Sequence, residues 1–488
     1  MNPTSPKKAR FAWCLYDWAN SAFATVILAA VLPVYFAGIV PPDGVAVPWS
    51  SQPIPATAFW GYTISVSMAL VALIAPGIGN LADHRGWRRP LLAIFCTLGA
   101  MSTCALWLTG PGQYWQVALL FVIGNIGFAA GNIFYNAFLP GLAIGHDADR
   151  LSARGFAFGY LGGGLMLLIV FVLIKSYSAF GFADIGQATR FGFLLTGVWW
   201  LGFALPCLMW VRDDKPTKSS TIALHSLKDF LRAFLHLKQY PDLLRFLIAF
   251  LLYNDGIQTI IAVSAIFARE ELGLSQGTIL GCFLMIQFVA TPGALLFARI
   301  AGHFGARKAI LICLSIFSLI TLYAATMHTA TEFWLLGFVV ALVLGGSQAI
   351  SRSFFASMVP RDRSAEFFGF YAISAKFASI FGPLVFALIA DLTGSARPCI
   401  LALAVVFVGY TALGGQAAVA WTDGVQLVLL GVLGLAVPAV AVLVGSDGLA
   451  GLPARLTAFP TGGAVDGVAI LGFLALTGLP GLVGGDIW

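Results

Sequence analysis

The sequence predicts an all-α membrane protein made of two six-helix halves, followed by two extra apolar segments. Hydrophobic residues make up 59% of the 488 residues and charged residues only 10%, whereas a soluble domain carries about a quarter charged residues. Twelve apolar runs long enough to cross a bilayer fall into two groups of six, and motifs of the first group recur in the second. The net charge of +6 comes from loops beside these runs, so it does not indicate a nucleic-acid partner.

The order of the apolar runs predicts four regions of the chain. Residues 1–211 form a first six-helix half, 212–242 a linker, 243–413 a second half and 414–488 a tail. The first run is too long for the core of a signal peptide, so we interpret it as a membrane helix. The expected spans are 11–40, 58–78, 91–110, 114–142, 154–175 and 190–211, then 243–267, 277–298, 308–327, 332–358, 367–391 and 397–413.

The linker is polar and contains no apolar run long enough to span a membrane. Its apolar side chains recur at helical spacing, which predicts an amphipathic helix lying on the membrane surface. They are Leu227, Phe230, Leu231, Phe234 and Leu235.

Lysine and arginine predict the orientation, because cytoplasmic loops are enriched in them. Twenty of these residues lie at the N-terminus, in alternate loops and in the linker, against four in the opposite loops. The N-terminus and the linker are therefore expected in the cytoplasm. Absence of a transit peptide and short outer loops favour a bacterial inner membrane.

The segment 79–91, GNLADHRGWRRPL, is expected to be a short charged turn between the second and third helices. Gly79 lets the preceding helix approach a neighbour, and Gly86 permits the reversal of the chain. Asp83 supplies a fixed anion, while three arginines are expected to hold the turn in water. The pattern resembles the corresponding loop of the major facilitator superfamily and predicts a conformational latch formed by Gly79, Asp83, Arg85, Gly86, Arg88 and Arg89. The alternative is an ordinary basic loop.

A weaker copy of this motif supports two homologous halves. In 298–310, ARIAGHFGARKAI, Gly305 stands 219 residues after Gly86, and Gly302 occupies the place of Asp83. FYNAFLP and FFASMVP end at Pro140 and Pro360, which are 220 residues apart. Two landmarks at nearly one offset favour a transporter built from repeats.

Ionisable residues within the predicted spans are candidates for function, because burying charge in lipid is costly. Asp17 and Asp255 occupy corresponding places in the two halves. Asp255 lies about twelve residues, roughly 18 Å, into its helix and is expected to bind a coupling proton or a substrate ammonium. For Asp17 the alternative is an acid favoured by the positive N-terminal end of its helix.

Two bases and several amides complete the predicted substrate and proton site. Arg352 is expected to hold a substrate carboxylate, and Lys376 adds positive charge; structural pairing with a carboxylate is the alternative for both. The polar partners are Asn20, Asn254, Gln258 and Gln348, with Ser21, Asn132, Asn136, Ser351 and Ser353 nearby. Gly155, Gly159 and Gly163, spaced by four, predict a close helix contact and not a phosphate-binding loop.

Other chemistries find little support in the sequence. The seven cysteines are scattered through apolar runs and are expected to be free thiols. The six histidines show no metal-ligand spacing, and neither a Walker A motif nor a strand-bounded dinucleotide motif occurs. We therefore expect no cofactor, no metal and no enzymatic activity.

An ordered set of motifs narrows the family. It comprises YDWANSAF (16–23), FYNAFLP (134–140), RGFAFGYLGGG (154–164), YNDGIQT (253–259), and GGSQAISRSFFA with AEFFGFY within 345–371. The set resembles the branch of the major facilitator superfamily that contains the autophagy-related vacuole effluxers and their bacterial relatives. The resemblance implies a secondary transporter, associated in the vacuolar members with amino-acid efflux.

The end of the chain differs. GGQAAVAWTDGVQ, within 414–426, resembles an internal stretch of sodium:solute symporters, and apolar runs follow at about 425–445 and 464–485. A fused or truncated reading frame is the preferred interpretation, and two accessory helices are the alternative.

Together these patterns predict alternating access for amino acids or similar small polar solutes, exported or exchanged, with protons as the coupling ion. Sodium coupling is an alternative mechanism. A membrane-embedded enzyme, and a non-transporting receptor or assembly scaffold on a transporter fold, are the alternatives from other classes.

Overall fold

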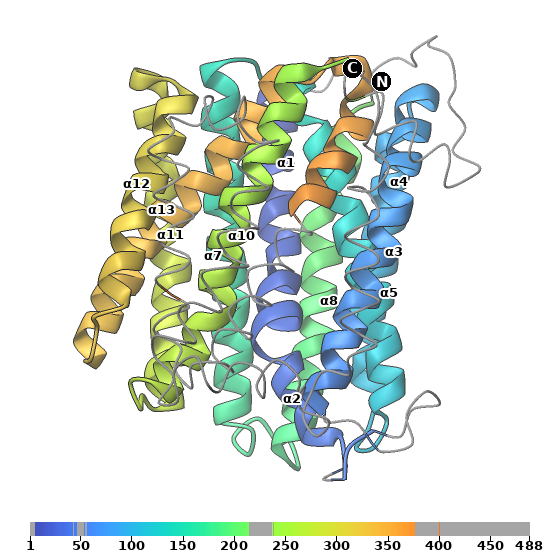
Figure 1. Ribbon diagram of the computed structural model, residues 1–488. Coiled ribbons are helices and arrows are strands. Elements are labelled where there is room, and N and C mark those ends of the chain that lie inside the picture. The colour runs from blue at the N-terminus through green and yellow to red at the C-terminus, as the bar shows by residue number, and fades with distance from the viewer. Residues whose placement is uncertain are drawn as a thin grey trace, which may run out of the picture.

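The computed structural model describes residues 5–41, 43–45, 53, 56–213, 237, 239–375 and 400, which form a bundle of long helices (Figure 1). Residues 364–375 are helical as well. The elements are α1 Pro6–Ala22, the π-helical η1 Phe23–Ala30, α2 Leu32–Ile39, α3 Ala56–Arg85, α4 Arg88–Ala105, η2 Leu106–Leu108, α5 Tyr114–Ala137, α6 Leu139–Leu142, α7 His146–Lys175, α8 Ile185–Trp210, α10 Pro241–Glu270, α11 Gln276–Phe304, α12 Ala306–Ala324, α13 Ala330–Met358 and η3 Arg361–Arg363.

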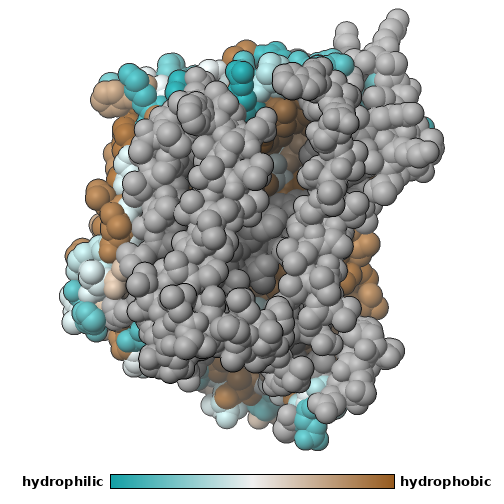
Figure 2. Space-filling view, viewed as in Figure 1, coloured by the Kyte–Doolittle hydropathy of each residue, from teal (hydrophilic) through white to brown (hydrophobic). Residues whose placement is uncertain are grey.

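Eight described helices are long and apolar enough to cross a membrane, and a ninth is added if α1–η1 and α2, bent by 41°, count as one span. The prediction of an all-α, multi-span membrane protein is confirmed. Figure 2 shows apolar side chains along the flank of the bundle and hydrophilic ones at its upper end. The amphipathic helix predicted in 212–242, the last two predicted spans of the second half and the tail 414–488 lie wholly or largely outside the described residues.

The upper end of the bundle in Figure 1 carries the N-terminus, and we call it the basic end. There α1, α4, α7 and α12 begin, and α3, α11 and α13 end. These termini are the places where the sequence clusters its lysines and arginines.

The first membrane helix changes direction because its backbone hydrogen bonding changes. The π-helical turn ends with the Val31 amide donating to the Val26 carbonyl at 2.9 Å. Pro33 follows in the first turn of α2, where its missing N–H costs nothing but its ring prevents the previous helix from continuing straight. The bend therefore lies between the segment that carries Asp17 and the far end of the same membrane span.

The glycine stripe on α7 packs against α1. A side chain at Gly155 would lie 2.6 Å from Asp17 Oδ2, and one at Gly159 would lie 2.6 Å from Ser21 Oγ. At Gly163 the nearest atom would be Thr25 Oγ1. Each of these positions therefore excludes a side chain, and the predicted close helix contact is confirmed.

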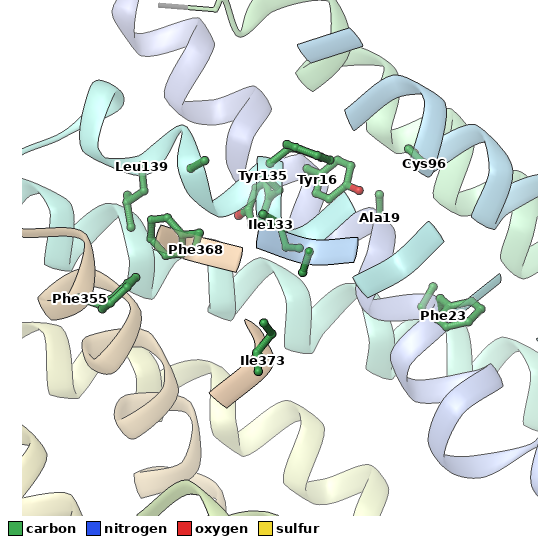
Figure 3. Close-up of a cluster of buried hydrophobic side chains, with 14 of the residues drawn as sticks. Tyr16, Ala19, Phe23, Cys96, Ile133, Tyr135, Leu139, Phe355, Phe368 and Ile373 are labelled. Carbon is green, nitrogen blue, oxygen red and sulfur yellow. The ribbon is translucent and has the colours of Figure 1, made fainter. Parts of the chain in front are cut away.

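A buried core cluster contains aromatic side chains from both halves. Tyr16 of α1 stacks on Tyr135 of α5, with ring centroids 4.8 Å apart. Figure 3 shows these rings in a buried cluster that also contains Phe355 and Phe368 of the second half. Phe355 in turn packs edge-on against Phe368 at 5.1 Å within the second half, and the same buried cluster contains side chains of both halves.

The predicted turn 79–91 is mostly helical. Helix α3 continues through Arg85, Gly86 adopts a φ of +64°, and α4 begins at Arg88. The expectation that all three arginines lie in water is wrong for Arg88, whose side chain is 4% exposed because it pairs with Asp83.

Candidate functional site

A buried ion pair connects the two halves. Asp17 on α1 and Arg352 on α13 are 3.0 Å apart between Oδ2 and Nη1, with side chains 10% and 4% exposed. Both residues were predicted as site residues, but not as partners. An acid and a base from opposite halves, away from water, can stay charged only while they remain paired.

Every nitrogen of the Arg352 guanidinium has a partner. Nε donates to Ser152 Oγ at 2.9 Å, and Nη2 donates to the Ser152 carbonyl at 2.8 Å. Nη1, besides Asp17, donates to Asn136 Oδ1 at 3.4 Å. Ser152 then donates its hydroxyl to the Ala349 carbonyl at 2.7 Å. In this conformation every guanidinium nitrogen of Arg352 is engaged within the protein, so structural pairing, the alternative raised for it, describes what is seen.

Aromatic rings surround the same guanidinium. Its central carbon lies 4.1 Å from the ring centroid of Phe156, 4.8 Å from Trp13 and 5.6 Å from Tyr135. Cation–π attraction is strongest where water is excluded. Tyr135 also donates its hydroxyl to Asp17 Oδ2 at 2.7 Å, so the carboxylate is held from both sides.

A second contact between the halves involves Asp83 at the basic end. Arg88 Nε lies 2.7 Å from Asp83 Oδ1. The carboxylate also accepts the backbone N–H groups of Ala365 and Glu366, at 3.2 and 2.9 Å. These amides open the helix that starts at residue 364, where N–H groups lack partners within the helix. Asp83 therefore caps a helix of the opposite half.

Asp83 lies five residues past the predicted span 58–78 and is nevertheless buried. Burial raises the pKa of its carboxyl to about 6, although Arg88 and the two backbone amides act in the other direction. The protonation state of this cap therefore changes near neutral pH.

Further contacts tighten the same region. Arg88 Nη2 donates to the Arg361 carbonyl at 2.8 Å, and Asn80 donates to Glu366 at 3.3 Å. Glu366 is paired with Arg363 at 2.7 Å. A side chain at Gly79 would lie 2.5 Å from the carbonyl oxygen of Ala365, so α3 and the opposite half meet through a position that excludes even a methyl group.

The remaining predicted latch residues have other contacts. The Arg85 guanidinium lies 4.7 Å from the ring centroid of Trp87. The backbone N–H of Arg89 donates to Asp213 at 2.8 Å. Gly86 supplies the turn through its positive φ. Arg85, Gly86 and Arg89 therefore shape the turn, while Gly79, Asp83 and Arg88 reach the second half.

The predicted substrate residues are only partly brought together. Gln348 lies one helical turn before Arg352 and accepts the Tyr160 hydroxyl at 2.8 Å, whereas Asn20 pairs with Asn132 at 2.7 Å within the first half. Asn254 donates to the Ala375 carbonyl at 3.4 Å. Asp255 and Gln258 are half-buried near the middle of α10, and Lys376 lies outside the described residues.

Several residues of the site were not singled out from the sequence as its members. Ser152 and Tyr135 bind Arg352 and Asp17, and Asp149 accepts the Ser353 hydroxyl at 2.6 Å across the halves. Glu366 lies within the AEFFGFY motif, which indicates the family but not the role of any single residue. Within the described residues no group of three or more metal-ligating side chains occurs, and the six described cysteines are free.

Comparison with known proteins identifies the family of this chain. The model of the "Vacuole effluxer Atg22 like" family matches residues 5–413. This chain belongs to that family. It is 34% identical over 404 residues to the "Uncharacterized MFS-type transporter YxiO" of Bacillus subtilis (strain 168), with 82% of this chain and 92% of that protein covered. It is 25% identical over 512 residues to "Autophagy-related protein 22" of Coccidioides immitis (strain RS), covering 81% and 84%.

Solved structures show the major facilitator fold. The human organic anion transporter MFSD10 matches with a TM-score of 0.66 at 16% identity, covering 84% of this chain and 99% of that chain. The proton:xylose symporter XylE matches with a TM-score of 0.62 at 15% identity, covering 84% and 94%. The chain is thus an MFS-type secondary transporter of the Atg22-like family and not an enzyme. The family match ends at residue 413 and lends no support to the predicted symporter resemblance of 414–488, which stays a prediction.

Proposed function

We propose that this transporter exports or exchanges amino acids or similar small solutes that carry a carboxylate, with protons as the coupling ion. The basic end would face the cytoplasm of a bacterial cell, in keeping with twenty lysines and arginines on that side against four opposite. The observation that carries the proposal is the buried Asp17–Arg352 pair between the halves.

The pair makes solute binding and opening mutually dependent. Alternating access requires the halves to separate at one end while they close at the other. When the basic end opens, Arg352 loses Asp17 and also Ser152, which both belong to the first half. A buried guanidinium without an anion is costly, so a solute carboxylate that takes the place of Asp17 stabilises the open arrangement.

A coupling proton fits the other partner. Once Arg352 has moved away, Asp17 is a buried carboxylate beside Tyr135, and binding a proton removes its charge. Asp255 on α10 is the second predicted proton or ammonium site. Asn20, Asn254, Gln258 and Gln348 would orient the solute, and Lys376 would add a positive charge.

The Asp83 contact serves as the latch. It joins α3 to the start of the helix at residue 364 and has no place for a solute, because Gly79 and Ala365 are in direct contact. Its role is to set the free energy of the arrangement that is closed at the basic end.

Counterflow in proteoliposomes loaded with a mixed amino-acid pool tests the proposal. Saturable exchange is expected for the full-length protein, dependent on an imposed proton gradient and lost in Arg352→Ala. Lys308→Gln, an exposed base at the same end, is the matched control and should retain exchange. Absence of exchange by folded protein would refute the substrate class and favour the scaffold alternative. Exchange by Asp255→Asn with unchanged proton dependence would remove Asp255 from the coupling mechanism.

A further inference from the structure

A further charged feature lies between the halves, on the outside of the bundle near the basic end. A pocket of about 370 Å³ is lined by Arg150, Arg154, Arg299, Leu295 and Ala298. Arg150 and Arg154 come from α7 of the first half, and Arg299 comes from α11 of the second half. The pocket therefore spans the line along which the halves separate, and its volume lies within the range of small-molecule sites.

The three guanidiniums are exposed, and none has a carboxylate partner among the described ion pairs. The nearest acids of α7 are engaged elsewhere: Asp147 lies 3.7 Å from Arg10, and Asp149 accepts the Ser353 hydroxyl. Helix α11 contains no Asp or Glu. Three like charges in one pocket repel each other across the halves unless an anion binds between them.

The position of the pocket indicates which kind of anion it would bind. Arg154 is eight residues, or about 12 Å, into α7 and is the first residue of the predicted span 154–175, where lipid headgroups are expected to meet the hydrocarbon region. Leu295 forms part of the wall, and the adjacent Leu296 is 44% exposed on the same helix. Guanidinium groups bind phosphate oxygens through paired hydrogen bonds, and basic pockets between membrane helices bind anionic headgroups.

We propose that Arg150, Arg154 and Arg299 form a binding site for a phosphate-bearing anion, supplied by an acidic phospholipid of the adjacent leaflet, which holds the two halves together at the basic end. The floor of the pocket connects it to the ion pair inside. Ala298 packs with Ala153 and Ala349, and Ala349 accepts the Ser152 hydroxyl that also holds Arg352. An anion in the pocket thus stabilises the arrangement in which Asp17 and Arg352 are paired.

The test uses the full-length protein in phosphatidylcholine bilayers, alone, with phosphatidylglycerol, or with inorganic phosphate. Hydrogen exchange at the amides of Ala365 and Glu366 reports closure of the basic end, because both donate to Asp83. Phosphatidylglycerol is expected to slow this exchange about tenfold, a typical coupling between two sites. Native mass spectrometry is expected to show retained phosphatidylglycerol. Both effects should be lost in Arg299→Gln and Arg154→Gln, and both should persist in Lys308→Gln.

The arms separate the sources of the anion. An equal effect of inorganic phosphate in phosphatidylcholine would retain the three-arginine site but overturn the assignment to lipid. Equal responses of Arg299→Gln and Lys308→Gln would show a general effect of surface charge and overturn the site. Because exposed arginines contribute little to stability, the variants are expected to fold, and lipid retention is measured independently of transport.

Discussion

Two of the contacts between the halves, those of Asp83 and Asp17, use a carboxylate in different ways. Asp83 has its arginine partner, Arg88, in its own half and reaches across the interface only to backbone amides. Asp17 has its arginine partner in the opposite half, enclosed by aromatic rings. Opening the basic end therefore leaves Asp83 still paired, but separates the charges of Asp17 and Arg352. In the proposed mechanism the outer contact is the latch and opens at modest cost, whereas the inner contact opens only when something else neutralises its charges.

The largest effect is expected from Asp17→Asn. Removing one member of a buried pair costs about 3–5 kcal/mol, which shifts the equilibrium toward opening at the basic end by more than a hundredfold. Hydrogen exchange at the Ala365 and Glu366 amides should accelerate accordingly. The matched control is Asp242→Asn, because Asp242 pairs with Arg245 at an exposed position, 3.3 Å apart. An exchange rate equal to wild type in Asp17→Asn would show that the inner pair does not hold the halves together.

A smaller effect is expected from Gly79→Ala, which acts on the outer contact. The added methyl group would overlap the backbone of Ala365, and such overpacking costs about 1–3 kcal/mol. Gly302 of the repeated motif provides the control, because it lies in the second half and has nothing within 4 Å of the added position. The same exchange measurement should show faster opening for Gly79→Ala alone. Equal effects of the two substitutions would mean that helix propensity, and not contact between the halves, explains the result.

The smallest effect is expected from pH. Burial raises the pKa of Asp83 in the closed arrangement to about 6, from an ordinary value of 3.8. Protonation of Asp83 therefore favours closure, and this stabilisation is lost as the pH rises through about 6. The change is at most tenfold per pH unit, because one proton is involved. Measured amide exchange, corrected for its intrinsic pH dependence, should follow this curve in wild type and become flat in Asp83→Asn. A curve unchanged in that variant would assign the titration to another group.

The membrane spans could be predicted from the sequence because hydropathy adds up over a whole helix. The expected spans 190–211 and 332–358 correspond to α8, Ile185–Trp210, and α13, Ala330–Met358. The error at 79–85 has a physical cause. Polar residues of α3 remain helical there because Asp83 and Arg88 pair with each other in a buried contact. A hydropathy scale instead assigns charged residues of this kind to an exposed loop.

The sequence predicted several residues of the site, but not which of them contact one another. Asp17 and Arg352 stood out because each places a charge in an apolar run, but their pairing depends on how the halves pack. The two positions are 335 residues apart, and no local pattern joins them. Ser152 gave no signal, and Tyr135 lay within the FYNAFLP motif without an assigned role, because a serine or tyrosine in a membrane helix is common and only the fold shows that each binds a charged partner.

The full set of Arg352 contacts also has an evolutionary consequence. Its three guanidinium nitrogens bind partners that all come from the other half of the chain. A lysine would keep the charge but not the planar arrangement of donors. A change at Asp17 alone would leave an unpaired buried base. Substitutions at positions 17 and 352 are therefore expected to occur together, because a protein that loses only one of the two residues closes poorly at the basic end.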